Sequence, residues 1–328
     1  MKKYKKFFMF LDNFSKIIIT SHENPDADAI SSEYALYLLL KKLGYNPAIM
    51  TCEEIPEKYS FINIGNYINV YSRENIINED LSDAALVVLD TNTPTNTGYI
   101  YNLIKDFIKD IFIIDHHEID ENIFNKEKSI IDENSSSTCE ILYNIFKYCH
   151  VDLDFPAAQA IYAGILYDTG SFIYPKTSSK TLEIASILVN KGVIPNNIYS
   201  NLYEMNSLSS LRLQSKVFSE IEFYHYNKIA LQVMLKTTLE YFKANYEDGD
   251  NIINLPLKCK DILVSVFFKE NYNGILRCSI RSKNNIDVVG IAKKYGGGGH
   301  TTAAGFKCTE SLEIVKEKVI KEIIQLLG

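Results

Sequence analysis

Between residues 16 and 191, short apolar runs alternate with longer amphipathic segments, and this alternation restricts the fold more than any other feature. The apolar runs at 16–20, 84–89 and 111–114 predict buried strands. The amphipathic segments predict helices at 29–43, 137–148, 156–168 and 179–191, the first of them closed by Gly44. Strands that alternate with helices indicate an α/β fold with a parallel sheet covered on both faces.

The pattern changes after residue 192. Pro195-Asn196-Asn197 interrupts the chain and a polar helical stretch follows, so we interpret 193–222 as a linker between domains at 1–192 and 223–328. The second domain has predicted strands at 228–235, 262–269 and 275–282 and a final helix at 312–327. Asn273-Gly274 predicts a type I′ hairpin turn between the last two strands. The sequence thus predicts a smaller α+β domain.

Composition restricts the partners and the compartment. The chain has 328 residues and a formal net charge of −7, which argues against binding long nucleic acid through its overall field. The six cysteines form no C-x-x-C pair and indicate reduced thiols in a reducing compartment. The apolar run at 7–11 is too short for a secretion signal or a membrane span, so an amphipathic first helix and a cytoplasmic location without membrane contact are expected.

Acidic and histidine side chains follow each predicted strand of the first domain. Asp115-His116-His117 comes directly after the third strand, and Asp90 ends the second. Because the carboxyl ends of parallel strands meet at one edge of a sheet, we expect these groups to converge. Six residues have side chains that suit a metal: His22, Asp26, Asp28, Asp90, His116 and Asp168.

The chemistry of these six ligands favours two divalent ions. Imidazole and carboxylate ligands without thiolates favour Mn²⁺ or Mg²⁺ over structural Zn²⁺. Six ligands exceed the need of one catalytic ion and suit a pair of ions that clamp a phosphoryl group. Considered singly, Asp26 or Asp28 could cap a helix and Asp90 could belong to a turn. Their recurrence at strand ends favours the metal site.

Two features of the second domain suggest anion binding. Gly296–Gly299 followed by His300 could form a nest of backbone N–H groups, although a glycine run also suits a flexible linker. Arg277 and Arg281 alternate onto one face of a predicted strand, where guanidinium groups could bind phosphate or simply face solvent.

Five ordered segments resemble the motifs of the DHH phosphoesterase family. The first four are His22-Glu23-Asn24-Pro25-Asp26-Ala27-Asp28-Ala29, Asp90-Thr91, Asp115-His116-His117 and Asp168-Thr169-Gly170. Gly296–His300 with Ala303-Ala304-Gly305 resembles the signature of the first type of DHH-associated C-terminal domain. The resemblance implies two lobes with the active site in the cleft between them.

The resemblance also implies a role for each residue. His22, Asp26 and Asp90 would hold one Mn²⁺, and Asp28, Asp90, His116 and Asp168 the second, with Asp90 bridging. His117 would contact the phosphate or leaving group, and Asp115 would orient a histidine. Substrate would be bound by Arg281, Arg277, His300 and the glycines Gly297, Gly298 and Gly299. Two positions depart from the family pattern: Ala27 replaces a common glycine, and an arginine often found after Asp90 is missing.

The implied activity is a Mn²⁺-dependent phosphodiesterase that uses in-line hydroxide attack at two metals. Its substrates would be short oligoribonucleotides or linear or cyclic dinucleotides, such as pApA or cyclic di-AMP. A 3′-phosphatase acting on pAp is an alternative enzyme, and a nucleotide-binding regulator is an alternative of another class. The retained ligands favour an enzyme. The sequence is also compatible with a homodimer.

Overall fold

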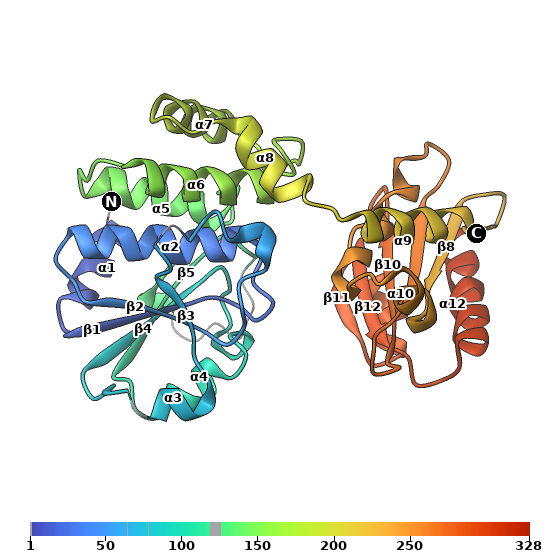
Figure 1. Ribbon diagram of the computed structural model, residues 1–328, viewed down its shortest axis with the longest axis horizontal. Coiled ribbons are helices and arrows are strands. Elements are labelled where there is room, and N and C mark those ends of the chain that lie inside the picture. Colours follow the sequence, from blue (N-terminus) through green and yellow to red (C-terminus); the bar gives the residue numbers. More distant parts are fainter. Residues whose placement is uncertain (1, 64, 78, 119–125) are drawn as a thin grey trace. The chain divides into compact units, whose positions relative to one another are not determined.

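The computed structural model describes residues 2–63, 65–77, 79–118 and 126–328. The chain forms two compact units, Met1–Met205 and Asn206–Gly328 (Figure 1). The division lies inside the segment 193–222 that the sequence predicts as a linker. That segment is largely helical, with α8 (Pro195–Tyr203) in the first unit and α9 (Leu208–Ser219) in the second.

The first unit is built on a six-stranded, fully parallel sheet in the order β3-β2-β1-β4-β5-β6. Its strands are β1 (Lys16–Thr20), β2 (Pro47–Thr51), β3 (Ile68–Val70), β4 (Ala84–Leu89), β5 (Asp110–Asp115) and β6 (Ser129–Ile131). The α/β fold is therefore confirmed, and β1 and β4 have the predicted bounds. The central strand β4 is buried along its whole length, as expected for a parallel strand covered on both faces.

Helices cover both faces of this sheet. The α-helices are α1 (Lys2–Leu11), α2 (Ala27–Lys42), α3 (Arg73–Ile77), α4 (Ile100–Ile104), α5 (Thr138–Tyr148), α6 (Phe155–Asp168) and α7 (Ser179–Asn190), followed by α8. Short 3₁₀ turns are η1 (Glu57–Tyr59), η2 (Pro94–Asn96) and η3 (Lys126–Lys128). Figure 1 shows α2, α5 and α6 on one face and α3 and α4 on the other, and each face has its own apolar core.

Polar side chains determine where the main helices begin. Asp26, Ser137, Asp154 and Ser178 each accept a hydrogen bond from a backbone N–H in the first turn of α2, α5, α6 and α7. Gly44 follows the end of α2 with a φ of +85°, a conformation that glycine adopts without strain. α2 begins two residues earlier than predicted because Asp26 is its cap.

The strand order places a ligand site at one edge. The chain runs outward from β1 to β3 in one direction and from β4 to β6 in the other, so the order reverses between β1 and β4. In open parallel sheets, ligands bind at the carboxyl ends of the strands that flank such a reversal. His22 follows β1 and Asp90 follows β4, so the topology brings these two residues to that point.

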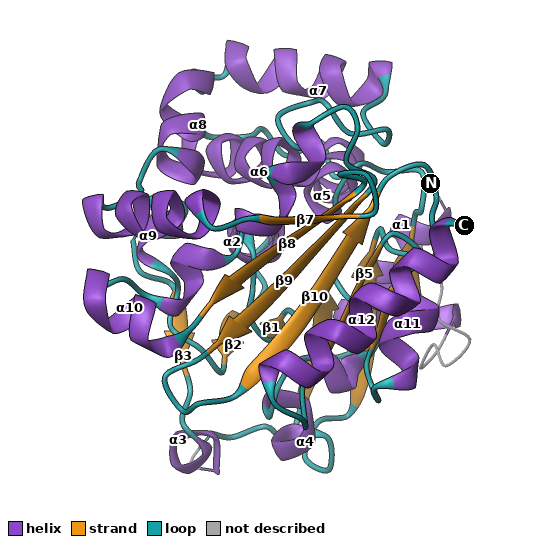
Figure 2. Ribbon diagram, turned by 90° about the vertical axis from the view of Figure 1, so that its right-hand side faces the viewer, coloured by secondary structure: helices purple, strands orange, loops and turns teal. Residues whose placement is uncertain are grey.

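The second unit contains a mixed six-stranded sheet in the order β11-β12-β10-β9-β8-β7. Its strands are β7 (Glu222–Tyr224), β8 (Ile229–Met234), β9 (Val264–Glu270), β10 (Leu276–Ser282), β11 (Gly298–His300) and β12 (Ala303–Lys307). Its further helices are α10 (Lys236–Phe242), α11 (Val289–Lys294) and α12 (Leu312–Leu327), with 3₁₀ turns η4 (Tyr246–Gly249), η5 (Ile252–Asn254) and η6 (Pro256–Lys258). Figure 2 shows β8, β9 and β10 side by side. Helices α11 and α12 pack against one face of this sheet and form the main apolar core of the second unit with it.

The turn between β9 and β10 corrects one prediction. The hairpin exists, but a type I′ turn requires positive φ at both central residues, and Gly274 alone of the pair has it, at +74°. Asn271 explains the difference, because its carbonyl accepts the N–H of Gly274 and its side chain accepts the N–H groups of Asn273 and Ile275. The result is a wider turn with glycine at its left-handed position. Among the described residues, no helix is long and apolar enough to cross a membrane.

Candidate active site

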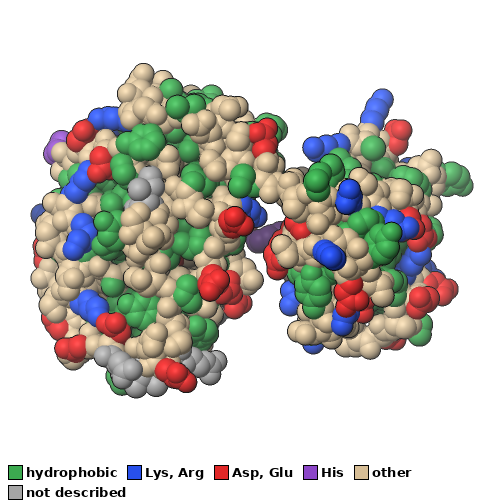
Figure 3. All heavy atoms as spheres, viewed as in Figure 1, with side chains coloured by type: hydrophobic (Ala, Val, Ile, Leu, Met, Phe, Trp, Pro, Cys, Tyr) green, Lys and Arg blue, Asp and Glu red, His purple; other side chains and the backbone are tan. Residues whose placement is uncertain are grey.

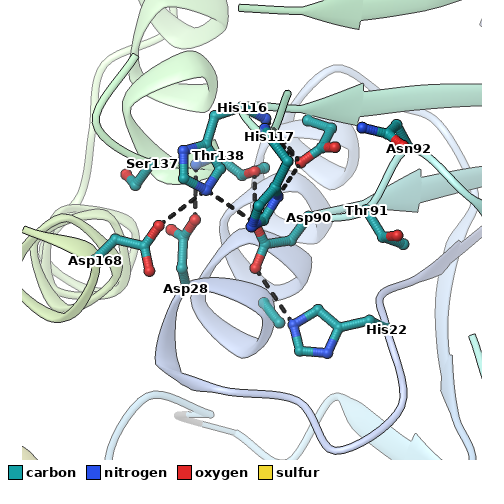
Figure 4. Close-up of polar contacts among 12 residues, drawn as sticks. His22, Asp28, Asp90, Thr91, Asn92, His116, His117, Ser137, Thr138 and Asp168 are labelled. Carbon is teal, nitrogen blue, oxygen red and sulfur yellow. Dashed lines mark hydrogen bonds and ion pairs between the residues drawn. The ribbon is translucent and has the colours of Figure 1, made fainter. Parts of the chain in front are cut away.

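The six predicted metal ligands converge at the carboxyl edge of the first sheet. Figure 4 shows His22, Asp28, Asp90, His116 and Asp168 pointing toward one another from the β1, β4 and β5 ends and from α2 and α6. Donor atoms of His22, Asp26 and Asp90 lie within 4.8 Å of one another, and so do those of Asp28, His116 and Asp168. The structure thus forms two adjacent three-residue groups from residues that are distant in the sequence.

Asp90 connects the two groups. Its Oδ2 lies 3.5 Å from Nε2 of His22, and its Oδ1 lies 3.5 Å from Nε2 of His116 (Figure 4). The backbone of Asp90 is left-handed, with a φ of +59°, and its N–H donates to the carbonyl of Ile114. An aspartate tolerates this conformation better than most residues, and such strain is characteristic of functional sites. The turn aims one carboxylate at both histidines.

The protonation of His22 follows from its neighbours. Its Nδ1 lies 2.8 Å from the carbonyl oxygen of Glu23, which can only accept a hydrogen bond. Nδ1 therefore carries a proton, and Nε2 is the ring nitrogen that faces Asp90. An imidazole bonded in this way through Nδ1 can offer Nε2 to a metal.

Asp115 orients the loop that carries both histidines. Its Oδ1 accepts hydrogen bonds from the backbone N–H groups of His116 and His117 and from Nδ1 of His117, the last at 2.7 Å. Burial would raise the pKa of Asp115, but the hydrogen bond and the charges of His117 and His116 bring it below its usual value. His116 is buried, whereas the side chain of His117 is half exposed, so the two rings have different access to solvent.

Asp26 and Asp28 serve helices as well as the site. Asp26 Oδ1 caps α2 by accepting from the N–H groups of Asp28 and Ala29, so the capping alternative holds alongside its place in the site. Asp28 is fully buried, and its carboxylate accepts from the N–H groups of Thr138 and Cys139 at 2.7 and 3.1 Å. Those donors are the first turn of α5, where the helix dipole favours a negative charge.

The carboxylates raise one another's pKa values. Burial and the charge of Asp168 raise the pKa of Asp28 to about 6. Burial and the neighbouring aspartates raise the pKa of Asp90 well above its usual value. Burial lowers the pKa of His116, but the close carboxylate of Asp168 and the charge of Asp28 outweigh it and raise the pKa. Four buried or half-buried carboxylates at such separations need cations to be fully ionised together.

The donor set fits divalent ions. Nε2 of His116 is buried 2.9 Å from Oδ2 of Asp168, yet neither ring nitrogen of His116 has a well-formed hydrogen bond within the described part of the chain. Buried ring nitrogens that lie beside carboxylates without such bonds suit metal ligands. His22, Asp26 and Asp90 could hold one ion, and Asp28, His116 and Asp168 another, with Asp90 reaching both.

A second layer of residues was missed by sequence reasoning. Thr138 donates its hydroxyl to Oδ1 of Asp90 at 2.9 Å, while its N–H binds Asp28. Buried Glu140 accepts from the hydroxyls of Ser136 and Thr181 at 2.7 and 2.8 Å, which ties α7 to the start of α5. The Ser-Ser-Ser-Thr run at 135–138 before a helix is a capping signal, but the contact with Asp28 spans 110 positions and has no local signature.

The glycine run is a strand rather than an open nest. The N–H groups of Gly296 and Gly297 donate to the carbonyls of Lys293 and Ala292, so they cap α11 and are not available to an anion. Gly298 to His300 form β11, which pairs with β12. A Cβ on Gly297 or Gly299 would lie 2.2 or 2.3 Å from a carbonyl oxygen of β12, so close strand packing requires both glycines. The flexible-linker alternative is therefore wrong.

The other predicted substrate residues lie on the same sheet. Arg277 and Arg281 share one face of β10, and Arg281 pairs in register with Ala303 of β12. Ala303 in turn pairs with His300 of β11, so His300 and Arg281 lie on the same face at this end of the sheet. Arg281 and His300 therefore flank Ala303 on one face of this sheet within the second unit.

The family models match both units. The model of the DHH family, N-terminal domain, matches residues 16–165, and the model of the DHHA1 domain matches residues 228–328. The two lobes and the site thus define a metal-dependent phosphoesterase, which is a hydrolase. The chain belongs to the DHH family, in the branch with a DHHA1 domain.

Relatives of similar length support this assignment. The chain is 28% identical to the bifunctional oligoribonuclease and PAP phosphatase NrnA of Mycoplasma genitalium, covering 96% of each chain. It is 29% identical to the protein of the same name from Bacillus subtilis, covering 89% of each. The crystal structure of an exopolyphosphatase-related protein from Bacteroides fragilis has a TM-score of 0.89 at 25% identity and covers 100% of this chain and 98% of its own.

Proposed function

We propose that this protein is a Mn²⁺-dependent phosphodiesterase that hydrolyses short oligoribonucleotides or linear or cyclic dinucleotides to mononucleotides. The observation that carries the proposal is the position of Asp90, whose two oxygens face the two histidine-carboxylate groups. Two relatives that match most of the chain are named as oligoribonucleases. Two bound divalent ions would supply charge for the phosphoryl oxygens and activate the attacking water.

The protein's own residues have separate roles in this proposal. His117 is held by Asp115 through Nδ1, so its half-exposed ring would present Nε2 to the phosphate or to the leaving oxygen. Thr138 would hold Asp90, and the first turn of α5 would hold Asp28. Arg281, Arg277, His300 and the backbone at Gly298 and Gly299 would bind the rest of the substrate. Gly297 would act by its packing, since its N–H is engaged in the cap of α11.

The charge distribution on one face and the net charge agree with small substrates. On the face drawn in Figure 3, acidic and basic side chains are interspersed and neither sign forms a continuous stripe. Proteins that track long nucleic acid present a continuous basic surface. A net charge of −7 points in the same direction. A cytoplasmic location and a homodimer are further predictions, and the free cysteines agree with a reducing compartment.

The test is hydrolysis of pApA, cyclic di-AMP and pAp by protein of measured metal content. We expect turnover of at least one diester with Mn²⁺ and none after chelation. Asp90→Asn should abolish most of it, whereas Asp106→Asn, at an exposed position in the same unit, should leave it unchanged. Folded, Mn²⁺-loaded protein that cleaves no diester would exclude the proposal.

A 3′-phosphatase acting on pAp is the second candidate, because the same relatives are also named as PAP phosphatases. The two activities are compared by kcat/KM on pAp and on pApA. A clear preference for pAp would make the phosphatase the main activity.

A further inference from the structure

The segment directly after the metal-ligand candidate Asp168 has an unusual backbone. Gly170, Ser171 and Phe172 have φ values of 55, 62 and 67°, so three consecutive residues are left-handed. This conformation is costly for a bulky residue such as Phe172 and persists only where surrounding contacts impose it. Such a turn directs the following residues in a way that an ordinary helix end does not.

Local contacts hold this turn. The buried hydroxyl of Thr169 accepts the N–H of Phe172 at 3.0 Å, and the N–H of Ser171 donates to the carbonyl of Leu166 at 2.8 Å. The ring of Phe172 packs edge-on against Tyr162, with ring centres 6.1 Å apart. The turn is therefore anchored to α6 by backbone bonds and by its aromatic side chain.

The turn places the ring of Tyr174 against a glycine. The N–H of Tyr174 donates to the carbonyl of Thr169, and a Cβ on Gly170 would lie only 2.5 Å from the Tyr174 ring. The ring thus packs closely on the Gly170 backbone. Tyr174 is nevertheless 56% exposed, so part of it remains open to solvent. A large aromatic that packs on backbone and stays exposed leaves ring surface that a flat group could contact.

The far end of the segment returns to the metal ligands. Nζ of Lys176 donates to the carbonyl oxygen of His116 at 3.1 Å. The segment therefore starts at Asp168 and ends on the loop that carries His116, and Tyr174 lies between these two anchors. The segment that carries Tyr174 is thus tied at both ends to a helix and a loop that supply metal-ligand candidates.

We propose that Tyr174 is the stacking platform for a nucleobase of the substrate. The inference rests on the proposed function, because a phosphate bound by the metal ligands would bring its attached nucleoside close to this ring. Every base has a flat π-face, so stacking recognises the presence of a base and discriminates weakly among bases. We expect the protein to require a base next to the phosphate but to tolerate different bases there.

The test compares the binding of AMP and ribose 5-phosphate by calorimetry with Mn²⁺ present. Tyr174→Ala should weaken AMP binding roughly 5- to 150-fold, the range measured for loss of one base–aromatic stack. Binding of ribose 5-phosphate should not change, and Tyr174→Phe should behave like the wild type. Tyr226→Ala is the matched control, because Tyr226 is 90% exposed in the second unit.

The outcomes separate this inference from the proposed function. A Tyr174→Ala protein that binds AMP as the wild type does would overturn the inference, and so would equal weakening of AMP and ribose 5-phosphate. Absence of AMP binding to the wild type would overturn it too. If AMP binding depends on Tyr174 but no diester is cleaved, the inference holds and the proposed phosphodiesterase does not.

Discussion

Asp90 contributes to the site through charge, position and backbone conformation together. Its left-handed φ directs the carboxylate between His22 and His116, and Thr138 fixes one of its oxygens. The same position places a buried negative charge among Asp26, Asp28 and Asp168, which is unfavourable without bound cations. Asp90 thus destabilises the metal-free protein, whereas the proposed activity of the metal-loaded protein requires it.

We expect Asp90→Asn to lower kcat/KM for a diester roughly 10²- to 10³-fold, since metal coordination contributes several kcal/mol to the transition state. The same change should raise the melting temperature of the metal-free protein, because it removes a repelled charge while keeping an acceptor for Thr138. Calorimetry of chelated protein checks this. A lower melting temperature than wild type would contradict the repulsion argument.

Glu33 is a second buried acid, located on α2. Burial raises its pKa to about 8 from an ordinary 4.5, and hydrogen bonds from Ser21 only partly offset this. The folded protein therefore keeps Glu33 protonated where the unfolded chain would ionise. Unfolding then releases a proton, so stability falls as the pH rises from 4.5 to about 8, by on the order of 5 kcal/mol at most.

Glu33→Gln should remove this pH dependence. Glutamine keeps the shape and an acceptor for Ser21 but does not ionise. We expect the variant to be more stable than wild type at pH 8 and equal to it near pH 4.5, measured by urea unfolding at both values. The exposed Glu183→Gln provides the matched control. Equal stability of wild type and Glu33→Gln at pH 8 would show that Glu33 is ionised in the folded protein.

At the scale of elements, the glycines of the β11–β12 hairpin differ in whether packing requires them. Gly297 and Gly299 are required because the backbone of β12 lies where a side chain would be. Gly298 has open space around its Cβ position and a φ that other residues adopt. Substitutions at Gly297 and at Gly298 can therefore distinguish the packing role of this glycine run from its proposed role in substrate binding.

Gly297→Ala should destabilise the second unit by about 1–3 kcal/mol, the usual cost of forcing extra volume into a packed site. Gly298→Ala should change stability by less than about 0.5 kcal/mol, as surface changes do. Denaturant unfolding of the full chain measures both. If Gly298→Ala weakens substrate binding while stability is kept, the proposed substrate role of this strand gains support.

At the scale of the whole molecule, the chain divides into two units with separate cores. The candidate metal ligands all belong to the first unit. A ligand stabilises only the part that binds it, by about 2.7 kcal/mol at a free concentration 100 times its dissociation constant.

Mn²⁺ should therefore raise the midpoint temperature at which the first unit unfolds and leave that of the second unit unchanged. Differential scanning calorimetry with and without Mn²⁺ measures this directly. Gly297→Ala should lower the midpoint temperature of the transition that does not respond to Mn²⁺. That result would assign this transition to the second unit. A single transition that shifts as a whole would show that the two units unfold together.

Elements with strong local signals were predictable, and those made by distant pairing were not. β4 is an unbroken apolar run, so its bounds were predicted without error. β3 has three residues, two of them exposed, and forms only because β2 offers an edge. β11 consists of two glycines and a histidine, which disfavour a strand until β12 lies beside them.

The sequence by itself determined the fold class and the six residues with metal-binding chemistry, because apolar periodicity and residue type are local properties of the chain. Only the tertiary structure decided how those residues are used. It turned Asp90 toward both histidines, set the first turn of α5 against Asp28, and laid Tyr174 over Gly170. Each of these depends on contacts or strained dihedrals that arise when packed elements meet, and local sequence does not encode them.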